Sequence, residues 1–240
     1  MKNRNVIILL ISLILFILGS FFLLRDIYLS KQSQSEYANL ENEAFLLFEE
    51  GESEEKNNAP VYATQVEEPD EYFPDFLAHL NTDFLYAKNN EYIGWIFIPC
   101  LELSYPIVQH SDNEYYTHYS FEGKRNSAGA IFLDCETLSD FTDYNTVIYG
   151  HNMRNKTMFG ALKELINVEL SEEDPLYIYI RTSNEVRKYL ISEVTVTFEG
   201  SDYYNNLPSD TKTITLSTCH GFMNAERVVV RAVFVSDLLV

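Results

Sequence analysis

The chain has 240 residues, which is enough for one sizeable domain with extensions, and 46% of them are hydrophobic, including 17 Tyr and 16 Phe. That composition supports a packed core and excludes an intrinsically disordered chain. The formal net charge of −19 argues against a nucleic-acid partner, because phosphate binding needs a basic surface, and a domain this acidic is repelled by anionic surfaces.

The first predicted element is an apolar run over 6–24 that only two serines and a glycine interrupt. It is long enough to cross a bilayer as one helix. A cleaved signal peptide is the alternative, but its apolar region would be shorter and would end in an A-x-A-like site, which the sequence lacks. Because only a few residues precede the run, we expect residues 1–25 to be a short cytoplasmic N-terminus and a single-pass transmembrane anchor, with an exported C-terminal domain.

Residues 26–71 are polar and acidic and include the run EEGESEEKNN over 49–58. Within this segment, Tyr37, Leu40, Ala44 and Leu47 recur at roughly helical spacing in SEYANLENEAFLLFEE. Two interpretations stay open. The plainer one is a spacer that separates the following domain from the membrane, and the other is a short amphipathic helix that docks its apolar face on that domain.

Residues 72–240 are predicted to form one domain of short strands. A helical stretch over 73–89 comes first, and one interior helix is expected over 157–166, where Met158, Ala161, Leu162 and Leu165 form an apolar stripe. Eight runs are rich in β-branched or aromatic residues and are bounded by turn residues, at 92–99, 104–109, 128–134, 145–150, 176–182, 186–199, 211–218 and 227–235. Eight short strands with few helices indicate a mostly antiparallel β-barrel.

The three cysteines are Cys100, Cys135 and Cys219, and they form no C-x-x-C pair and no cluster with histidines. A structural zinc site is therefore not expected. Cys100 and Cys135 each end an apolar run, so we expect them to be buried or without a chemical role, and a disulfide between them stays open. Cys219 instead ends the polar face of the run TKTITLSTC, so it is either a structural cysteine or a nucleophile.

A thiol nucleophile needs a partner that handles protons, most often a histidine. His151 stands apart from the other histidines because it lies where the predicted strand NTVIYG meets the loop HNMRNKT, a position that a sheet holds and a loop exposes. Arg227 begins the last predicted strand. If that strand pairs with the strand that ends at Cys219, the guanidinium lies across from the thiol and can stabilise an oxyanion; an ordinary surface arginine is the alternative.

Together these residues resemble the sortases, most closely those of class B. The resemblance is carried by TLSTC with RVVV eight positions after its cysteine, by VIYGHNMRNKTMFGAL, and by EYIGWIFIPCLELSYPIVQHSDNEYYTHYSFEGKRNSAGAIFLD. It extends over roughly 72–237, nearly all of the external domain. It implies a sortase-type eight-stranded β-barrel with a few short helices, which makes 72–240 the catalytic domain, tethered by one transmembrane helix to the outer face of a Gram-positive cell membrane.

The resemblance also implies a cysteine transpeptidase that needs no cofactor and no metal. Cys219 would attack the carbonyl of a threonine in the C-terminal sorting signal of a secreted surface protein and form a thioester. His151 would protonate the leaving amine and later help to deprotonate the incoming one, and Arg227 would hold the substrate and stabilise the oxyanion. The acceptor would be an amine of a peptidoglycan precursor or a lysine of a pilin.

Ser217, Thr218 and Asn152 match the motifs beside the cysteine and the histidine, so the resemblance implies that they bind the substrate. The chain departs from many class B sortases in the connection EGSDYYNNLPSDTK over 199–212, which is too short for their long helix. Because this loop helps to recognise the signal, Asn-Pro-x-Thr-x is our first expectation, with Ser-Pro and Leu-Pro variants open. Two other functions are alternatives: a cysteine peptidase that uses water as acceptor, and a non-catalytic binding barrel, which would predict the loss of a catalytic position.

Overall fold

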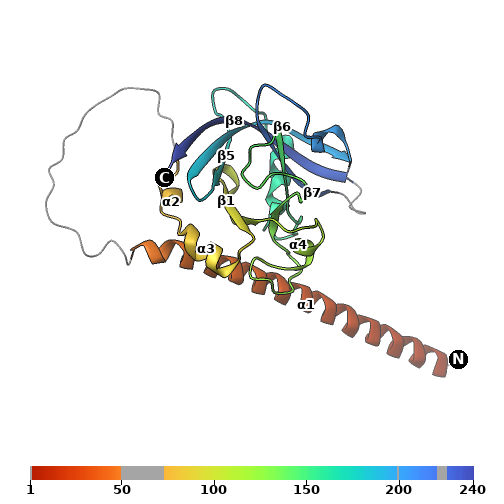
Figure 1. Ribbon diagram of the computed structural model, residues 1–240. Coiled ribbons are helices and arrows are strands. Elements are labelled where there is room, and N and C mark those ends of the chain that lie inside the picture. Colours follow the sequence, from red (N-terminus) through yellow and green to blue (C-terminus); the bar gives the residue numbers. More distant parts are fainter. Residues whose placement is uncertain (1, 50–72, 199, 221–225) are drawn as a thin grey trace.

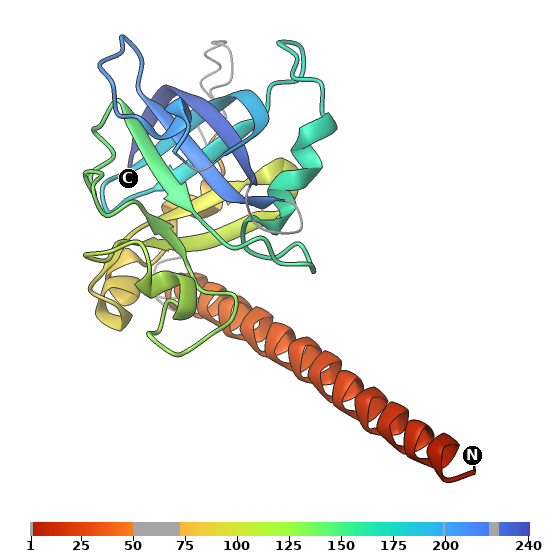
Figure 2. The same ribbon diagram turned by 90° about the vertical axis from the view of Figure 1, so that its right-hand side faces the viewer.

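The structure is a computed structural model that describes residues 2–49, 73–198, 200–220 and 226–240, with backbone only for 2–9, 46–49, 219 and 220. One long helix runs beside a β-barrel (Figures 1 and 2). Most of the predicted acidic run over 49–58, and residue 199 of the predicted short connection, lie outside the described residues.

Eight strands close into a barrel in the order β1-β2-β3-β4-β7-β8-β6-β5. The pairs β2–β3 and β4–β7 are parallel, and the other six are antiparallel. The mostly antiparallel eight-stranded barrel predicted from the sequence is therefore confirmed. The strands are β1 (Tyr92–Ile98), β2 (Leu103–Val108), β3 (Ile131–Leu133), β4 (Asn145–Tyr149), β5 (Tyr177–Arg181), β6 (Glu185–Phe198), β7 (Thr213–His220) and β8 (Glu226–Leu239).

Both faces of β7 are buried. Ile214 and Leu216 are 0% exposed on the apolar face, and Thr215 is 0% exposed on the polar face. The polar face is covered by the connection between β6 and β7, which Asn145 holds in place. The Asn145 amide donates to the carbonyl of Tyr203 in that connection (2.9 Å), while its Oδ1 accepts from the Thr215 hydroxyl (2.7 Å). Thr213 and Thr215 of this strand are therefore buried hydrogen-bonding residues.

The short helices correct two sequence predictions. The stretch over 73–89 is two helices, α2 (Asp75–Ala78) and α3 (Thr82–Lys88), because Asn81 begins a new helix by accepting a hydrogen bond from the Phe84 amide (2.9 Å). The interior helix is of the 3₁₀ type, η2, and spans Phe159–Asn167. The remaining short helices are η1 (Pro99–Leu101), α4 (Tyr115–His118) and η3 (Asp202–Tyr204).

The late start of η2 has a local cause. Met158 has a φ of +53°, outside the helical region. A Cβ on Gly160 would lie 2.3 Å from the Met153 carbonyl oxygen, so the backbone passes very close to the preceding loop. The predicted apolar stripe is nevertheless buried, including Leu162 at 0% and Leu165 at 2% exposure.

Helix α1 (Lys2–Glu49) is continuous. Its N-terminal half projects away from the barrel, and its C-terminal half lies along the barrel beside α3 (Figures 1 and 2). The projecting half is long and apolar enough to cross a membrane, judged by length and composition. Tyr37, Leu40 and Ala44 are buried at 6%, 2% and 0% exposure, as the docked-helix alternative predicted. The helix passes residue 26 without a break, and the proposed segment boundaries stay a prediction.

Candidate active site

Strand pairing brings the three predicted catalytic positions to one end of the barrel. In the parallel β4–β7 pair, Tyr149 lies opposite Ser217, and the Gly150 amide still donates to the Ser217 carbonyl (3.2 Å). Parallel strands advance in step, so His151 and Cys219 each lie two residues beyond that pair. In the antiparallel β7–β8 pair, Cys219 is directly opposite Arg227. The predicted hairpin is thereby confirmed.

A hollow of about 190 Å³ opens at this end of the barrel. Four of the predicted site residues line it, namely His151, Arg227, Ser217 and Thr218. Asn152 is not among its lining residues, and its backbone instead forms a bridge with Met158. Sequence reasoning missed five further lining residues, which are Asn113, Thr117, Phe132, Tyr149 and Gly150.

A backbone carbonyl orients the imidazole of His151. Its Nε2 lies 2.7 Å from the carbonyl oxygen of Thr117, and because a carbonyl only accepts, Nε2 carries the hydrogen and donates. In the neutral ring Nδ1 is then the nitrogen that accepts a proton. Gly150, the residue before His151, is packed so closely that it has no room for a side chain. A Cβ there would lie 2.5 Å from Ile131 and 2.8 Å from the ring of Phe159.

The loop that holds Thr117 is itself tightly packed. Gly129 has a φ of +58°, and a Cβ at that position would lie 2.3 Å from the Tyr116 carbonyl oxygen and 3.1 Å from Cδ2 of His151. The Tyr37 hydroxyl of α1 donates to the Gly129 carbonyl (2.6 Å). Helix α1 therefore contacts this loop, and the loop in turn contacts His151. The only sequence signal for this loop was its richness in tyrosine.

Tyr149 lines the hollow, and Tyr204 packs against it from outside the set of lining residues. The rings of Tyr149 and Tyr204 stack with their centroids 6.3 Å apart and their planes 16° apart. The Tyr149 hydroxyl donates to Asp134 (2.9 Å), and the Tyr204 hydroxyl shares a hydrogen bond with the Ser217 hydroxyl (2.9 Å). Tyr204 belongs to η3, in the short connection between β6 and β7, so this connection contacts a residue that lines the hollow.

Thr218 lines the same hollow. It is 2% exposed, and its hydroxyl has no hydrogen-bond partner within the part of the chain that the structure describes. A buried hydroxyl without a partner costs about 1–3 kcal/mol, so a polar group of a ligand that reaches it would gain a hydrogen bond at little further desolvation cost.

The other cysteines lie outside this hollow. Cys100 and Cys135 are free thiols, so the disulfide between them that the sequence left open is not formed. Cys100 is exposed and Cys135 is partly exposed, which makes the expectation of burial wrong for both. Partial burial raises the pKa of the Cys100 thiol above its ordinary value. Within the described ranges, no three His, Cys, Asp or Glu side chains lie close enough to hold a metal ion.

These features define a class of protein: a closed β-barrel with a histidine, a cysteine and an arginine at one end of three adjacent strands. The model of the Sortase domain family matches residues 96–235, more than half of the chain, and the chain belongs to the sortase family. The sequence resemblance to class B sortases is confirmed by the relatives that it matches.

Two curated relatives are both sortase B. The protein of Listeria monocytogenes is 36% identical over 116 residues, which cover 48% of this chain and 47% of that protein. The protein of Staphylococcus aureus is 30% identical over 101 residues, which cover 42% of this chain and 40% of that protein. The chain thus spans about half the length of the curated relatives it matches.

Solved structures agree on the fold. Sortase B of Clostridium perfringens superposes with a TM-score of 0.56 at 26% identity, covering 64% of this chain and 99% of that one. Sortase B of Bacillus anthracis in complex with AAEK2 gives a TM-score of 0.57 at 27% identity, with 65% and 83% covered. A Staphylococcus aureus sortase B–substrate complex gives 0.65 at 20% identity, with 86% and 98% covered, and shows the fold alone.

Proposed function

We propose that this chain is a membrane-anchored cysteine transpeptidase that cleaves the C-terminal sorting signal of secreted proteins after threonine. It then transfers the acyl group to an amine. The proposal is carried by one observation: strand register brings positions 151, 219 and 227 to one end of the barrel, around a hollow lined by His151 and Arg227. Membership of the sortase family supports the same chemistry.

The reaction proceeds in two acyl transfers. The sulfur of Cys219 attacks the carbonyl carbon of the signal's threonine, and electrons move to the carbonyl oxygen, where Arg227 stabilises the negative charge. The carbon–nitrogen bond then breaks, and the leaving amine takes a proton from His151. An acceptor amine attacks the resulting thioester, loses a proton to His151 and releases the sulfur as a thiolate, so the cycle begins and ends with a Cys219 thiolate and a protonated His151.

The packing around His151 supports its role as the proton carrier. The Thr117 carbonyl accepts the hydrogen on Nε2 (2.7 Å), which leaves Nδ1 to exchange protons with the reacting groups. The buried hydroxyl of Thr218, which has no partner among the described residues, is suited to a hydrogen bond with the bound peptide. Ser217 lines the hollow, shares a hydrogen bond with the Tyr204 hydroxyl and contacts the substrate from the same strand as Thr218.

The same proposal covers location. The apolar half of α1 anchors the chain as a single-pass helix with its N-terminus in the cytoplasm, and the barrel lies on the outer face of the membrane. This placement is typical of an enzyme whose substrates are secreted. It also puts the amine of a cell-wall precursor, or of a pilin, within the compartment where the barrel acts.

The short β6–β7 connection bears on specificity. Its described part, 200–212, contains a single turn of 3₁₀ helix, η3, and no longer helix. Tyr204 of this turn stacks on Tyr149 and shares a hydrogen bond with Ser217, and both of these residues line the hollow. We expect Asn-Pro-x-Thr-x signals to be the preferred substrates, with Ser-Pro and Leu-Pro variants as the competitors to test.

Intact-mass spectrometry tests the proposal on the full chain in detergent micelles. The chain is mixed with peptides bearing the three signals, with and without an amine acceptor, beside Cys219→Ala. We expect a thioester adduct on Cys219 that the amine converts into a ligated peptide. Hydrolysis at a rate that the amine leaves unchanged would establish the peptidase alternative, and a folded chain that forms no adduct with any of the peptides would contradict the proposal.

A further inference from the structure

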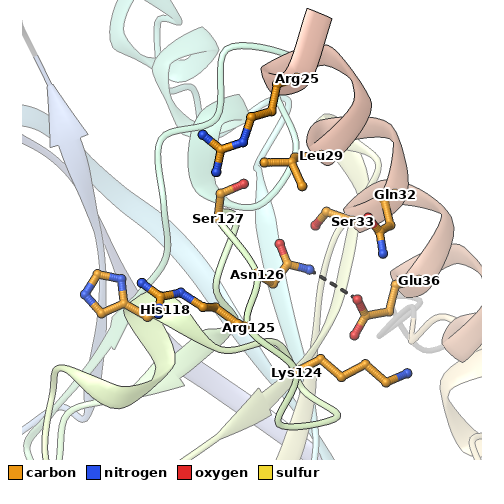
Figure 3. A pocket seen from close by; sticks show the side chains of 10 residues that line it. All are labelled: Arg25, Leu29, Gln32, Ser33, Glu36, His118, Lys124, Arg125, Asn126 and Ser127. Carbon is orange, nitrogen blue, oxygen red and sulfur yellow. Dashed lines mark hydrogen bonds between the residues drawn. The ribbon is translucent and has the colours of Figure 1, made fainter. Parts of the chain in front are cut away.

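A second hollow, of about 430 Å³, lies between α1 and the loop that follows α4 (Figure 3). In Figure 3, side chains of the helix face those of the loop across this space. The helix contributes Arg25, Leu29, Gln32, Ser33 and Glu36, and α4 with its following loop contributes His118, Lys124, Arg125, Asn126 and Ser127.

The permanent charges around this hollow are mainly positive. Arg25, Lys124 and Arg125 line it together with one carboxylate, Glu36, and Lys124 is ion-paired with Glu122, which lies outside the lining. The Glu36 carboxylate accepts hydrogen bonds from two neutral donors, the Asn126 amide (3.2 Å) and the Ser120 hydroxyl. Neither arginine has a carboxylate within ion-pair distance among the residues with described side chains. This local positive charge contrasts with the net charge of −19 for the chain.

The position of the hollow along α1 matches the membrane surface. The apolar run ends at Leu24, and Arg25 follows at once. A helix rises about 1.5 Å per residue, so Leu29 lies roughly 7 Å beyond the end of the run. The polar layer on each side of a bilayer is about 5–8 Å thick. The turn of α1 from Arg25 to Leu29, which lines one end of the hollow, therefore lies at the depth of the lipid headgroups.

We propose that this hollow binds the phosphate of an anionic phospholipid headgroup. The inference rests on the membrane placement in the proposed function. Guanidinium groups bind phosphate oxygens with paired, charge-assisted hydrogen bonds, and Arg25 and Arg125 approach the hollow from two different elements. The rest of this acidic chain is repelled by an anionic membrane. Attraction of this hollow to the anionic membrane, together with repulsion of the acidic remainder of the chain, fixes the orientation of the barrel relative to the bilayer.

Native mass spectrometry of the full chain, released from neutral detergent micelles, measures this binding. Phosphatidylglycerol and phosphatidylcholine with identical acyl chains are titrated separately, and a third arm contains inorganic phosphate alone. We expect phosphatidylglycerol to bind at least tenfold more tightly than phosphatidylcholine. Each arginine contributes about fivefold, so Arg25→Gln with Arg125→Gln is expected to remove that preference, with a loss of about 25-fold.

Lys31→Gln is the matched control, because Lys31 is an exposed cation on the same helix that does not line the hollow. It is expected to bind as the unaltered chain does. Arg25→Gln alone provides a second variant, since Arg25 is exposed on the helix and its loss leaves the barrel core untouched. Urea unfolding of each variant, followed by the fluorescence of Trp95, verifies that the barrel is folded.

Three outcomes overturn the inference: equal binding of the two lipids, equal losses in Lys31→Gln and Arg25→Gln, or inorganic phosphate bound as tightly as phosphatidylglycerol. The readout does not depend on Cys219. A chain that prefers phosphatidylglycerol but never forms an acyl adduct overturns the proposed reaction alone, whereas a chain that ligates peptides without lipid preference overturns this inference alone.

Discussion

Gly129 is the position where one added methyl group is expected to affect both the stability of the barrel and the catalytic histidine. Its φ of +58° lies in the left-handed region, which costs an L-residue with a Cβ about 1–2 kcal/mol. In Gly129→Ala the new Cβ would lie 2.3 Å from the Tyr116 carbonyl oxygen and 3.1 Å from the His151 ring. Because the first of these neighbours is backbone, the loop has to move.

The size of the effect follows from these contacts. Relieving an overpacked contact costs about 1–3 kcal/mol, so we expect Gly129→Ala to lower the free energy of unfolding by about 2–5 kcal/mol in total. A shift of about 1 Å at Tyr116 also moves Thr117, whose carbonyl holds the His151 ring at 2.7 Å. Misplacement on that scale lowers catalytic rates by up to about a hundredfold.

The assay uses urea unfolding of the full chain in neutral detergent, followed by the fluorescence of Trp95. Trp95 is the single tryptophan, and it is 0% exposed in β1. Ligation of a sorting-signal peptide by the same samples reports activity. Gly200→Ala is the matched control, because Gly200 has a φ of +79° with nothing within 4 Å of the added Cβ. It carries the backbone cost of about 1–2 kcal/mol without the clash.

The comparison of the two glycines decides whether the close approach at Gly129 matters. If Gly129→Ala lost no more stability than Gly200→Ala and ligated peptide at the unaltered rate, the packing argument for the loop would be refuted. Greater loss of stability with unchanged activity would show that the loop stabilises the barrel without positioning His151.

Three further outcomes are expected. Tyr204→Phe keeps the stacked ring but loses the hydrogen bond to Ser217, so steady-state kinetics are expected to show a KM raised severalfold with little change in kcat. Burial raises the pKa of Tyr37 above its ordinary value of about 10. The neutral Tyr37 hydroxyl stabilises the folded state fully below about pH 10, and this stabilisation is lost as the pH rises further. Tyr37→Phe is therefore expected to remove about 1.4 kcal/mol per pH unit from the alkaline slope of the unfolding free energy in urea. Asn145→Ala removes the hydrogen bonds of its amide to two connection carbonyls and the better of the two acceptors of the Thr215 hydroxyl, and thermal unfolding is expected to show a loss of about 2–4 kcal/mol.

Much of the site could be predicted because its elements are local in sequence. Cys219 and Arg227 are joined by one hairpin, and the alternation in TKTITLSTC together with the β-branched run after Arg227 indicated two adjacent strands. His151 was identified by its place at a strand end. The residue that orients it, Thr117, is 34 positions away, and no pattern in the sequence relates the two.

The sequence by itself determined the parts of this protein that depend on periodicity and hydropathy. Alternating apolar residues specify the strands because side chains on a strand point to opposite faces, and the apolar run over 6–24 specifies a helix suited to a bilayer. The tertiary structure decided where the C-terminal half of α1 lies, because the Tyr37 hydroxyl donates a hydrogen bond to the carbonyl of Gly129, which is 92 residues away in the sequence. It also decided that the polar face of β7 is buried under the β6–β7 connection, and that Arg25 and Arg125 face one hollow. Contacts between distant segments form only when complete helices and strands pack against one another. The residue pattern of one segment predicts its own secondary structure but does not indicate which other segment it will contact.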